Sequence, residues 1–145
     1  MFVLCPTMAR MSQLVLRYFA SDDGCLDVAV ISDKFSGHGG FWIHDQDVRV
    51  FGEELSTYPI RPEAPLTVAW GYEMLEGENL VVGVEIVPEN SRGDLRVRVE
   101  LADYTERSER VRTSFQTTYA ELDRFRTAIA ALMDRMAEEA ILRGR

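Results

Sequence analysis

The segment from Asp94 to Glu121, DLRVRVELADYTERSERVRTSFQTTYAE, decides the fold because it holds two strand patterns and the start of a helix. Hydrophobic side chains occupy every second position in LRVRVEL, and a similar alternation returns in RVRTSFQT, which is typical of half-buried strands. The TYAE that follows has a Thr and a Glu three residues apart, the pattern of a helix capping box. We therefore expect strands at 94–101 and 110–117, followed directly by a helix at 119–142.

Similar alternation occurs in the sequence before this segment. Turn-forming residues separate the runs, as expected for strands joined by short connections. The glycine-rich stretch at 36–40 interrupts the pattern, so we expect a hairpin loop there. The further strands predicted in this way are 14–19, 26–30, 41–43, 66–73 and 80–87.

A shorter helix is expected at about 46–57. Asp45 stands where its cap would be, and Pro59 ends it, because the residue before a proline is disfavoured in the helical region. Gly52 lies inside this helix, where glycine costs about 1 kcal/mol relative to alanine. We expect Gly52 to allow the helix to approach the sheet closely.

These elements predict an α+β protein. If the apolar positions share one face, the strands form a single antiparallel sheet of about six or seven strands, and the helices at 46–57 and 119–142 pack on one face of it. The second helix would be longer than the strands, so its last turns, at 140–142, would overhang the sheet. We expect those turns to close one end of the core or to form a homodimer contact through this C-terminal helix.

Length and composition predict a single domain. The chain has 145 residues, of which 46% are hydrophobic and 28% are charged, values typical of a soluble globular protein. We expect an α+β domain at 12–145, and residues 1–11 suit a disordered N-terminal extension, or a segment upstream of an alternative start at Met11. The sequence shows no membrane span and no secretory signal, and Cys5 and Cys25 suit reduced thiols, so we expect a cytoplasmic protein without membrane contacts.

Charge is the feature that bears most on partners. The chain has 16 basic and 24 acidic residues and a net charge of −8. Residues 53–90 contain eight acids and one base, Arg61. Nucleic acid is disfavoured as a partner, whereas a basic protein would be attracted. The same acids also suit a surface that only keeps the protein soluble. If a partner binds, we expect Glu73, Glu76 and Glu78 to contact it.

The sequence contains no assembled catalytic or metal-binding motif. The glycines at 36–40 do not precede a helix, so they lack the helix N-terminus of a phosphate-binding loop. His38, His44, Asp45 and Asp47 are able to ligate metals, but their spacing matches no familiar site. We therefore expect no cofactor, no metal and no catalytic residues, and a protein that is not an enzyme. An enzyme with an unrecognised site remains an alternative.

The polar face of the last strands carries several arginines. If Val99 pairs with Val111, two of these arginines lie directly opposite each other on neighbouring strands. Opposed like charges destabilise a sheet, so an acidic group, internal or from a partner, would complete the arrangement. The alternative is that the arginines splay apart and pair with Glu85 and Glu100. The candidate partner-binding residues on this face are Arg96, Arg98 and Arg112.

Glycine and aromatic positions recur in an order that is found in a known group of proteins. The run FSGHGGFWI at 35–43 is followed by a helix with Phe51 and Leu55 and then by Tyr58-Pro59. A glycine-containing turn, two strands and Thr118-Tyr119 at the start of the last helix come later. Over residues 14–142 this order resembles small uncharacterised bacterial α+β proteins related to WapI-type immunity proteins.

The resemblance implies a non-catalytic, cytoplasmic binding protein that neutralises a polymorphic toxin by occlusion. An acidic surface would suit a basic toxin domain as the partner. The residues themselves leave a different class of function open, a module that binds a small ligand or an anion on the arginine-bearing face.

Overall fold

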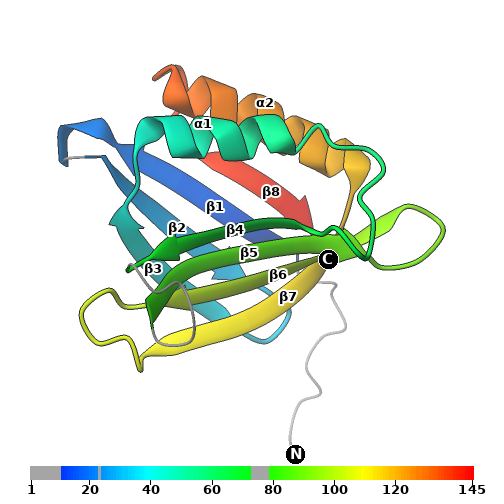
Figure 1. Cartoon of the computed structure of the whole chain (residues 1–145), viewed down its shortest axis with the longest axis horizontal. Coiled ribbons are helices and arrows are strands. Elements are labelled where there is room, and N and C mark those ends of the chain that lie inside the picture. The colour runs from blue at the N-terminus through cyan, green and yellow to red at the C-terminus, as the bar shows by residue number, and fades with distance from the viewer. Residues whose placement is uncertain (1–10, 23, 73–78) are drawn as a thin grey trace, which may run out of the picture.

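A computed structural model describes residues 11–22, 24–72 and 79–145 (Figure 1). The α+β class and the antiparallel strand arrangement predicted from the sequence are confirmed. Residues 1–10 of the expected extension lie outside the described residues. In chain order the elements are β1 (Ser12–Phe19), η1 (Ala20–Asp22), β2 (Cys25–Ile31), β3 (Ser36–Trp42), α1 (Asp45–Glu54), β4 (Leu66–Gly71), β5 (Leu80–Pro88), β6 (Asp94–Ala102), β7 (Arg110–Thr118), α2 (Tyr119–Met133) and β8 (Ala140–Gly144).

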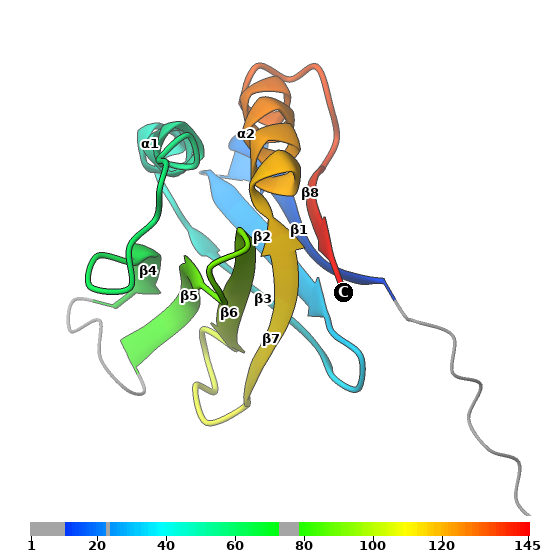
Figure 2. The same ribbon diagram turned by 90° about the vertical axis from the view of Figure 1, so that its right-hand side faces the viewer.

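The strands form two sheets of four, so the prediction of a single sheet of six or seven strands is wrong. The first sheet has the order β3-β2-β1-β8, and the second sheet has the order β4-β5-β6-β7. Each sheet has its own apolar face, and both faces contribute to one buried core together with the helices. Figure 2 shows both helices lying over the two sheets at one end of the molecule. Alternation within a strand predicts a buried face but not which element covers it.

Strand β3 contains the glycine-rich stretch that was predicted to be a loop. That prediction is wrong, because residues 36–42 pair with β2 along their whole length. A Cβ atom on Gly37 would lie 2.0 Å from Cγ1 of Val111, and one on Gly39 would lie 3.0 Å from the carbonyl oxygen of Ala102. Side chains here would push the two sheets apart, so these glycines allow close packing of β3 on the second sheet.

Helix α1 differs from its prediction at both ends. His44 and not Asp45 is the N-cap, since Nδ1 of His44 accepts a hydrogen bond from the Gln46 amide at 3.2 Å. The helix ends at Glu54 instead of residue 57. The close approach predicted for Gly52 is made to the other helix, because a Cβ atom there would lie 2.9 Å from Cγ2 of Ile129.

Helix α2 begins where the capping box predicted and ends earlier than predicted. The Thr118 hydroxyl accepts a hydrogen bond from the Glu121 amide at 3.2 Å. At the other end Arg135 has a left-handed φ of 61°, and the Met136 amide donates to the Ala131 carbonyl at 2.8 Å, which is a helix-terminating motif usually made with glycine. The predicted apolar positions buried on this helix are Leu122, Phe125, Ile129 and Leu132.

The residues after α2 form a strand, not the overhanging helical turns that were predicted. Strand β8 pairs with β1 at the edge of the first sheet, and its Ala140 and Leu142 side chains are fully buried. The backbones of Gln116 and Arg145 exchange two hydrogen bonds of 2.9 Å, which join the two sheets at this corner. The homodimer contact was expected from overhanging helical turns, and strand β8 occupies that part of the chain instead. Met136, predicted on the buried face of the helix, is 83% exposed.

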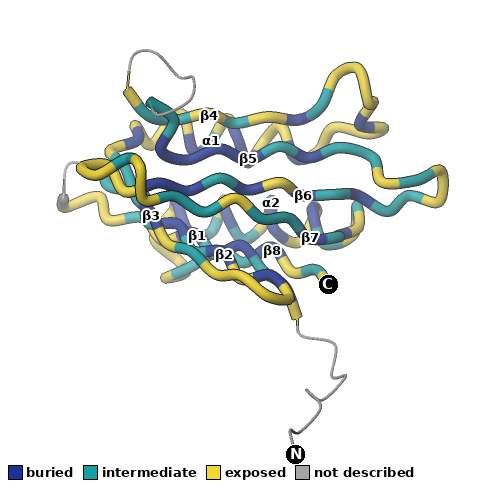
Figure 3. Tube along the Cα trace, turned by 90° about the horizontal axis from the view of Figure 1, so that it is seen from below, coloured by how far each residue is buried: buried dark blue, intermediate teal, exposed yellow. Residues whose placement is uncertain are grey.

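The core lies between the two sheets and under the helices. Phe51 of α1 connects these layers, since its ring centroid lies 5.9 Å from that of Trp70 on β4 and 6.3 Å from that of Phe125 on α2. Figure 3 shows buried residues recurring along the central strands β5 and β6, while the turns at the strand ends are exposed. The outer face of the second sheet and the turns at its end therefore remain accessible.

Candidate functional site

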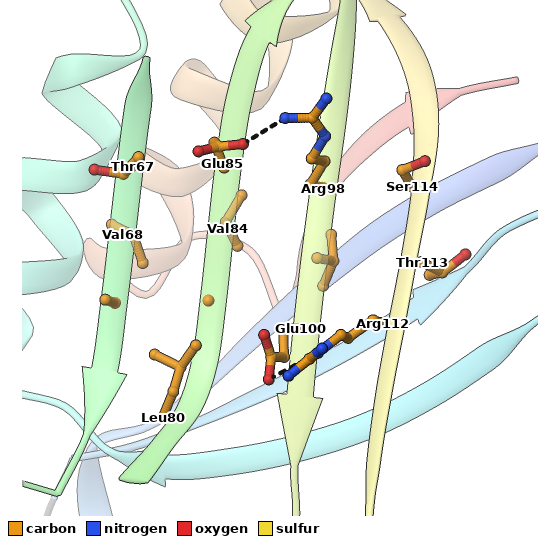
Figure 4. Close-up of a pocket in the computed structure, with 13 residues that line it drawn as sticks. Thr67, Val68, Leu80, Val84, Glu85, Arg98, Glu100, Arg112, Thr113 and Ser114 are labelled. Atoms are coloured by element: carbon orange, nitrogen blue, oxygen red, sulfur yellow. Dashed lines mark hydrogen bonds and ion pairs between the residues drawn. The ribbon is translucent and has the colours of Figure 1, made fainter. Parts of the chain in front are cut away.

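The outer face of the second sheet carries a hollow of about 550 Å³, which we call the charged hollow (Figure 4). Alternation along the strands turns every second residue toward this face. Small side chains lie at its centre, where Ala69 of β4 is paired with Gly83 of β5. The polar and charged residues around them are Thr67, Glu85, Arg98, Glu100, Arg112 and Ser114.

Leu80 contributes an apolar side chain to the charged hollow, although its alternation predicted the buried face. The register between β4 and β5 shifts after Trp70, so that Trp70 pairs with Val82 while Gly71 pairs with Leu80. Val81 is the extra residue of this bulge and is fully buried. A bulge reverses the side-chain alternation on one side of it, so Leu80 lies on the outer face. There it packs against Gly83, where an added Cβ atom would be 2.9 Å from Cδ2 of Leu80.

The arginines of the charged hollow are paired with acids, and the predicted opposition of two arginines is wrong. Val99 pairs with Thr113 and not with Val111, a shift of the register that keeps every residue on its predicted face. Arg98 now lies opposite Ser114 and donates to Glu85 at 2.8 Å. The alternative from the sequence, in which the arginines pair with Glu85 and Glu100, describes the observed contacts.

Two turns with Asx side chains explain the shifted register. Between β6 and β7, Oδ2 of Asp103 accepts hydrogen bonds from the amides of Thr105 and Glu106 at 3.0 and 2.7 Å. Between β5 and β6, the Asn90 side chain accepts from the Arg92 amide at 2.8 Å, and Gly93 has a φ of 96°. Asp and Asn side chains stabilise such turns locally, and these turns set which residues of the strands face each other.

Glu100 is shared between two arginines. Its carboxylate accepts from Nη1 of Arg110 in a short contact and lies 3.3 Å from Nε of Arg112. The Arg110 side chain is largely buried, at 13% exposure, whereas that of Arg112 is 70% exposed. Because one carboxylate serves two guanidinium groups, Arg112 presents an incompletely neutralised positive charge to solvent.

Arg96, the third predicted arginine, lies further along the same face and is held by Glu89. Its Nε and Nη2 atoms donate to the two carboxylate oxygens at 2.7 and 3.1 Å. The hydrogen bond from Arg96 holds the pKa of Glu89 below its ordinary value, against the smaller opposing effect of desolvation. The same hydrogen bond raises the pKa of Arg96. This pair is therefore fully ionised at neutral pH.

A group of four aromatic side chains, of which three are exposed, lies at the end of the sandwich, beyond the charged hollow. We call Phe41, Trp42, Tyr72 and Tyr104 the aromatic cluster. Phe41 lies 5.3 Å from Tyr72 and Trp42 lies 5.0 Å from Tyr104, as ring centroids in edge-to-face contacts. Trp42 is 50% exposed and Tyr104 is 42% exposed, although large aromatic side chains usually bury most of their surface.

The aromatic cluster is held in place by polar contacts. The Tyr72 hydroxyl donates to the Tyr104 carbonyl at 2.5 Å, and the Arg107 guanidinium lies 4.3 Å from the centroid of the Tyr72 ring. Nη1 of Arg107 also donates to Oδ1 of Asn79 at 3.0 Å. These contacts join the connection between β6 and β7 to the end of β4, so the exposed rings are fixed by the fold.

Acidic residues without ion pairs surround the aromatic cluster. Residues 103–109 connect β6 to β7, and we call them the acidic turn. Asp103, Glu106 and Glu109 are exposed, and none of them forms an ion pair with another described residue. The one base in the turn, Arg107, is occupied by Tyr72 and Asn79. The acidic turn therefore presents unbalanced negative charge beside exposed rings.

The six residues predicted to contact a partner fall into two groups. Glu73, Glu76 and Glu78 lie outside the described residues. The structure brings Arg96, Arg98 and Arg112 to one face of the second sheet, as the alternation predicted. Trp42 and Tyr104 were not predicted to contact a partner, because they are far apart in the chain. One sequence signal could have indicated that Trp42 is exposed. Alternation puts Trp42 on the same face as the polar His44, whereas Phe41 shares the other face with Ile43.

The potential metal ligands of the sequence analysis do not come together at one site, although His44 and Asp45 lie 3.3 Å apart. His38 contacts the Asp27 carboxylate on the outer face of the first sheet, whereas His44 caps α1. The described part of the chain contains no group of three or more His, Cys, Asp or Glu residues arranged to hold a metal ion. Among the described residues there is also no helix with the length and apolar composition needed to cross a membrane.

Comparisons with protein-family models, with curated proteins and with solved structures found no match to this chain. The relationship to WapI-type immunity proteins accordingly stays a prediction from glycine and aromatic positions.

Proposed function

We propose that this chain is a non-catalytic module that binds a basic protein. The observation that carries the proposal is the aromatic cluster, in which Trp42 and Tyr104 are about half exposed and pack edge-to-face, with Tyr104 in the acidic turn itself. Exposed Trp and Tyr side chains in a fixed arrangement are characteristic of the residues that dominate protein interfaces.

The energetic argument is that these rings bury more apolar surface in a complex than they do in the free protein. Burial of apolar area contributes about 25 cal/mol per Å², and a ring already held by its neighbours loses little conformational freedom on binding. The Tyr72 ring is fixed by the hydrogen bond from its hydroxyl to the backbone carbonyl of Tyr104, and the Tyr104 ring packs edge-to-face against that of Trp42. The aromatic cluster is thus prepared for association before a partner arrives.

Charge supports a basic partner. The net charge of −8 would steer a cationic protein toward this one, and the acids of the acidic turn would orient it at the aromatic cluster. Glu53, Glu54 and Glu63 are also exposed and add to the acidic stretch that the sequence analysis singled out. A toxin domain bound by occlusion, as for a cytoplasmic immunity protein, is the specific form of this proposal that the resemblance favours.

A second candidate function is binding of a small anion in the charged hollow. The observation that favours it is Arg112, which shares Glu100 with Arg110 and is 70% exposed. A phosphate or carboxylate group would complete the charge balance there. On this reading phosphate should raise the melting temperature of the protein, and Arg112→Ala should abolish the rise. Unchanged melting at saturating phosphate would remove this candidate.

The protein-binding proposal is tested by affinity capture from a lysate of the source organism at low and moderate salt. We expect one basic protein to be recovered preferentially at low salt, because screening weakens exposed charge interactions. The variant Trp42→Ala/Tyr104→Ala should lose that protein. Phe35→Ala is the matched control, because Phe35 is a 61% exposed aromatic residue of the connection between β2 and β3. Equal recovery by wild type and the double variant would contradict the proposal.

A further inference from the structure

A small cavity lies beside the aromatic cluster and has a chemistry of its own. Its volume is about 210 Å³, which is below the range of about 300–1,000 Å³ for sites that hold drug-sized ligands. Three aromatic residues, Phe41, Trp42 and Tyr104, and two acids, Asp27 and Asp103, line it together with His38 and Cys25. We call it the acidic aromatic pocket.

Trp42 and Tyr104 come from different sheets and form one corner of the pocket. Trp42 ends β3 of the first sheet, while Tyr104 belongs to the turn that follows β6 of the second. Their ring planes are inclined at 76° with centroids 5.0 Å apart. In such an edge-to-face pair the edge of one ring packs against one face of the other, so the pair leaves at least one face of each ring uncovered, and the faces of aromatic rings attract cations.

Both carboxylates line the pocket, Asp27 from β2 and Asp103 from the turn after β6. Asp27 lies on β2 directly opposite Gly40 of β3, so the residue paired with it has no side chain to cover it. Its side chain is 28% exposed and contacts Nε2 of His38. Asp103 uses Oδ2 to accept hydrogen bonds from the amides of Thr105 and Glu106, and these amides hold the carboxylate in position.

We propose that the acidic aromatic pocket receives a lysine or arginine side chain of the partner protein. This inference rests on the proposed function, because it identifies the group through which a basic protein would be recognised. A cationic head has both of the interactions that the pocket offers, the ring faces and the carboxylates. The alkyl stem of the same side chain suits the aromatic surface at the entrance.

Other occupants match the pocket less well. An anion would be repelled by Asp27 and Asp103, and an apolar side chain would desolvate these carboxylates without replacing their hydrogen bonds. A bare metal ion is also disfavoured, because the described residues contain no group of three or more His, Cys, Asp or Glu side chains arranged to hold one. The combination of rings, carboxylates and small size therefore selects an organic cation.

The test is a titration with a capped Gly-Arg-Gly peptide, followed by NMR through the indole N–H of Trp42. The matched probe replaces arginine with citrulline, which has nearly the same shape but no charge. We expect the arginine peptide to shift the Trp42 signal, and the citrulline peptide to bind about tenfold more weakly. A capped Gly-Lys-Gly peptide should bind, whereas a capped Gly-Glu-Gly peptide should not.

Variants identify the pocket as the site. Asp103→Asn keeps an amide oxygen that can accept the hydrogen bonds of the turn, and it should weaken arginine-peptide binding about three- to tenfold. Asp33→Asn is the matched control, since Asp33 is exposed in the connection at the other end of the β2–β3 hairpin, and it should leave binding unchanged. Tyr104→Ala should weaken binding while Phe35→Ala should not.

Two results would overturn the inference. One is equal binding of the arginine and citrulline peptides, and the other is an unchanged affinity in Asp103→Asn. Neither result depends on the capture experiment, so the pocket can fail while the basic partner is still recovered. Conversely, peptide binding at the pocket without any captured protein would count against the proposed function alone.

Discussion

The charged hollow and the region of the aromatic cluster differ in whether their charged side chains form ion pairs. In the charged hollow Arg98 and Arg112 each reach an acid of a neighbouring strand. In the acidic turn beside the aromatic cluster Asp103, Glu106 and Glu109 form no ion pair with described residues, and large rings are exposed next to them. Charges that are paired within the chain stabilise the fold, whereas unpaired charges beside apolar surface are free to interact with another molecule.

The largest expected effect is the loss of partner affinity when a ring of the aromatic cluster is removed. Trp42→Ala should weaken binding of the captured partner by about 2 kcal/mol or more, which is about 30-fold in affinity, because central aromatic residues dominate interfaces. The free energy of unfolding should change much less, since half of the side chain is already in water. Calorimetric titration and urea unfolding measure the two quantities. A variant that loses stability as much as affinity would show that Trp42 serves the fold.

The converse change is Glu100→Gln in the charged hollow. It leaves two arginines without their shared carboxylate, and Arg110 is largely buried, so the free energy of unfolding should fall by about 2 kcal/mol. Partner affinity should stay the same. Glu85→Gln is the matched control, because its partner Arg98 is 60% exposed and such pairs contribute about 0–1 kcal/mol. An equal fall in the free energy of unfolding of the two variants would mean that burial of Arg110 does not increase the cost of removing its carboxylate partner.

Much of the fold could be predicted because local rules determine it. Alternation located the strands of the second sheet and their faces, apart from Leu80, and Thr118 located the start of α2. The two-sheet arrangement was missed because alternation identifies an apolar face without identifying its cover. β8 was missed because Arg135, and not a glycine, takes the left-handed conformation that ends α2, which leaves no stop signal in the sequence.

The candidate sites were predictable to different degrees for the same reason. Arg98 and Arg112 were placed on one face by alternation, and only their pairing was wrong, since the Asp103 turn sets the register. Trp42 and Tyr104 could not be brought together from the sequence, because their contact depends on how the two sheets pack. Sites within one sheet follow from local periodicity, whereas sites between sheets need the tertiary structure.

A smaller effect concerns association with the partner. Neutralising the acidic turn, with Asp103→Asn, Glu106→Gln and Glu109→Gln, should slow association about tenfold at low salt and much less at high salt. The matched control removes the same number of charges from the other acidic region, with Glu53→Gln, Glu54→Gln and Glu63→Gln. Stopped-flow measurements at two salt concentrations compare them. Equal slowing by both triple variants would show that net charge, and not the acidic turn, steers the partner.

The smallest effect is a pH dependence of stability on the outer face of the second sheet. The hydrogen bond from Arg96 lowers the pKa of Glu89 below its ordinary value of 4.5, so the folded protein binds this proton less tightly than the unfolded chain does. The pair therefore contributes stability that is fully present above the unfolded pKa and is lost as the pH falls through the lower, folded pKa. Glu89→Gln removes the titrating group.

Unfolding by urea at a series of pH values would measure this contribution. The difference in unfolding free energy between wild type and Glu89→Gln should be constant near neutral pH and should shrink as the pH falls below about 4.5. Arg96→Gln should flatten the same part of the curve, and the double variant should add little, because both substitutions remove one interaction. If the difference did not change with pH, the Glu89–Arg96 ion pair would contribute nothing measurable to the stability of the fold. Pairing of these two charges would then not distinguish this face from the acidic turn in its effect on stability.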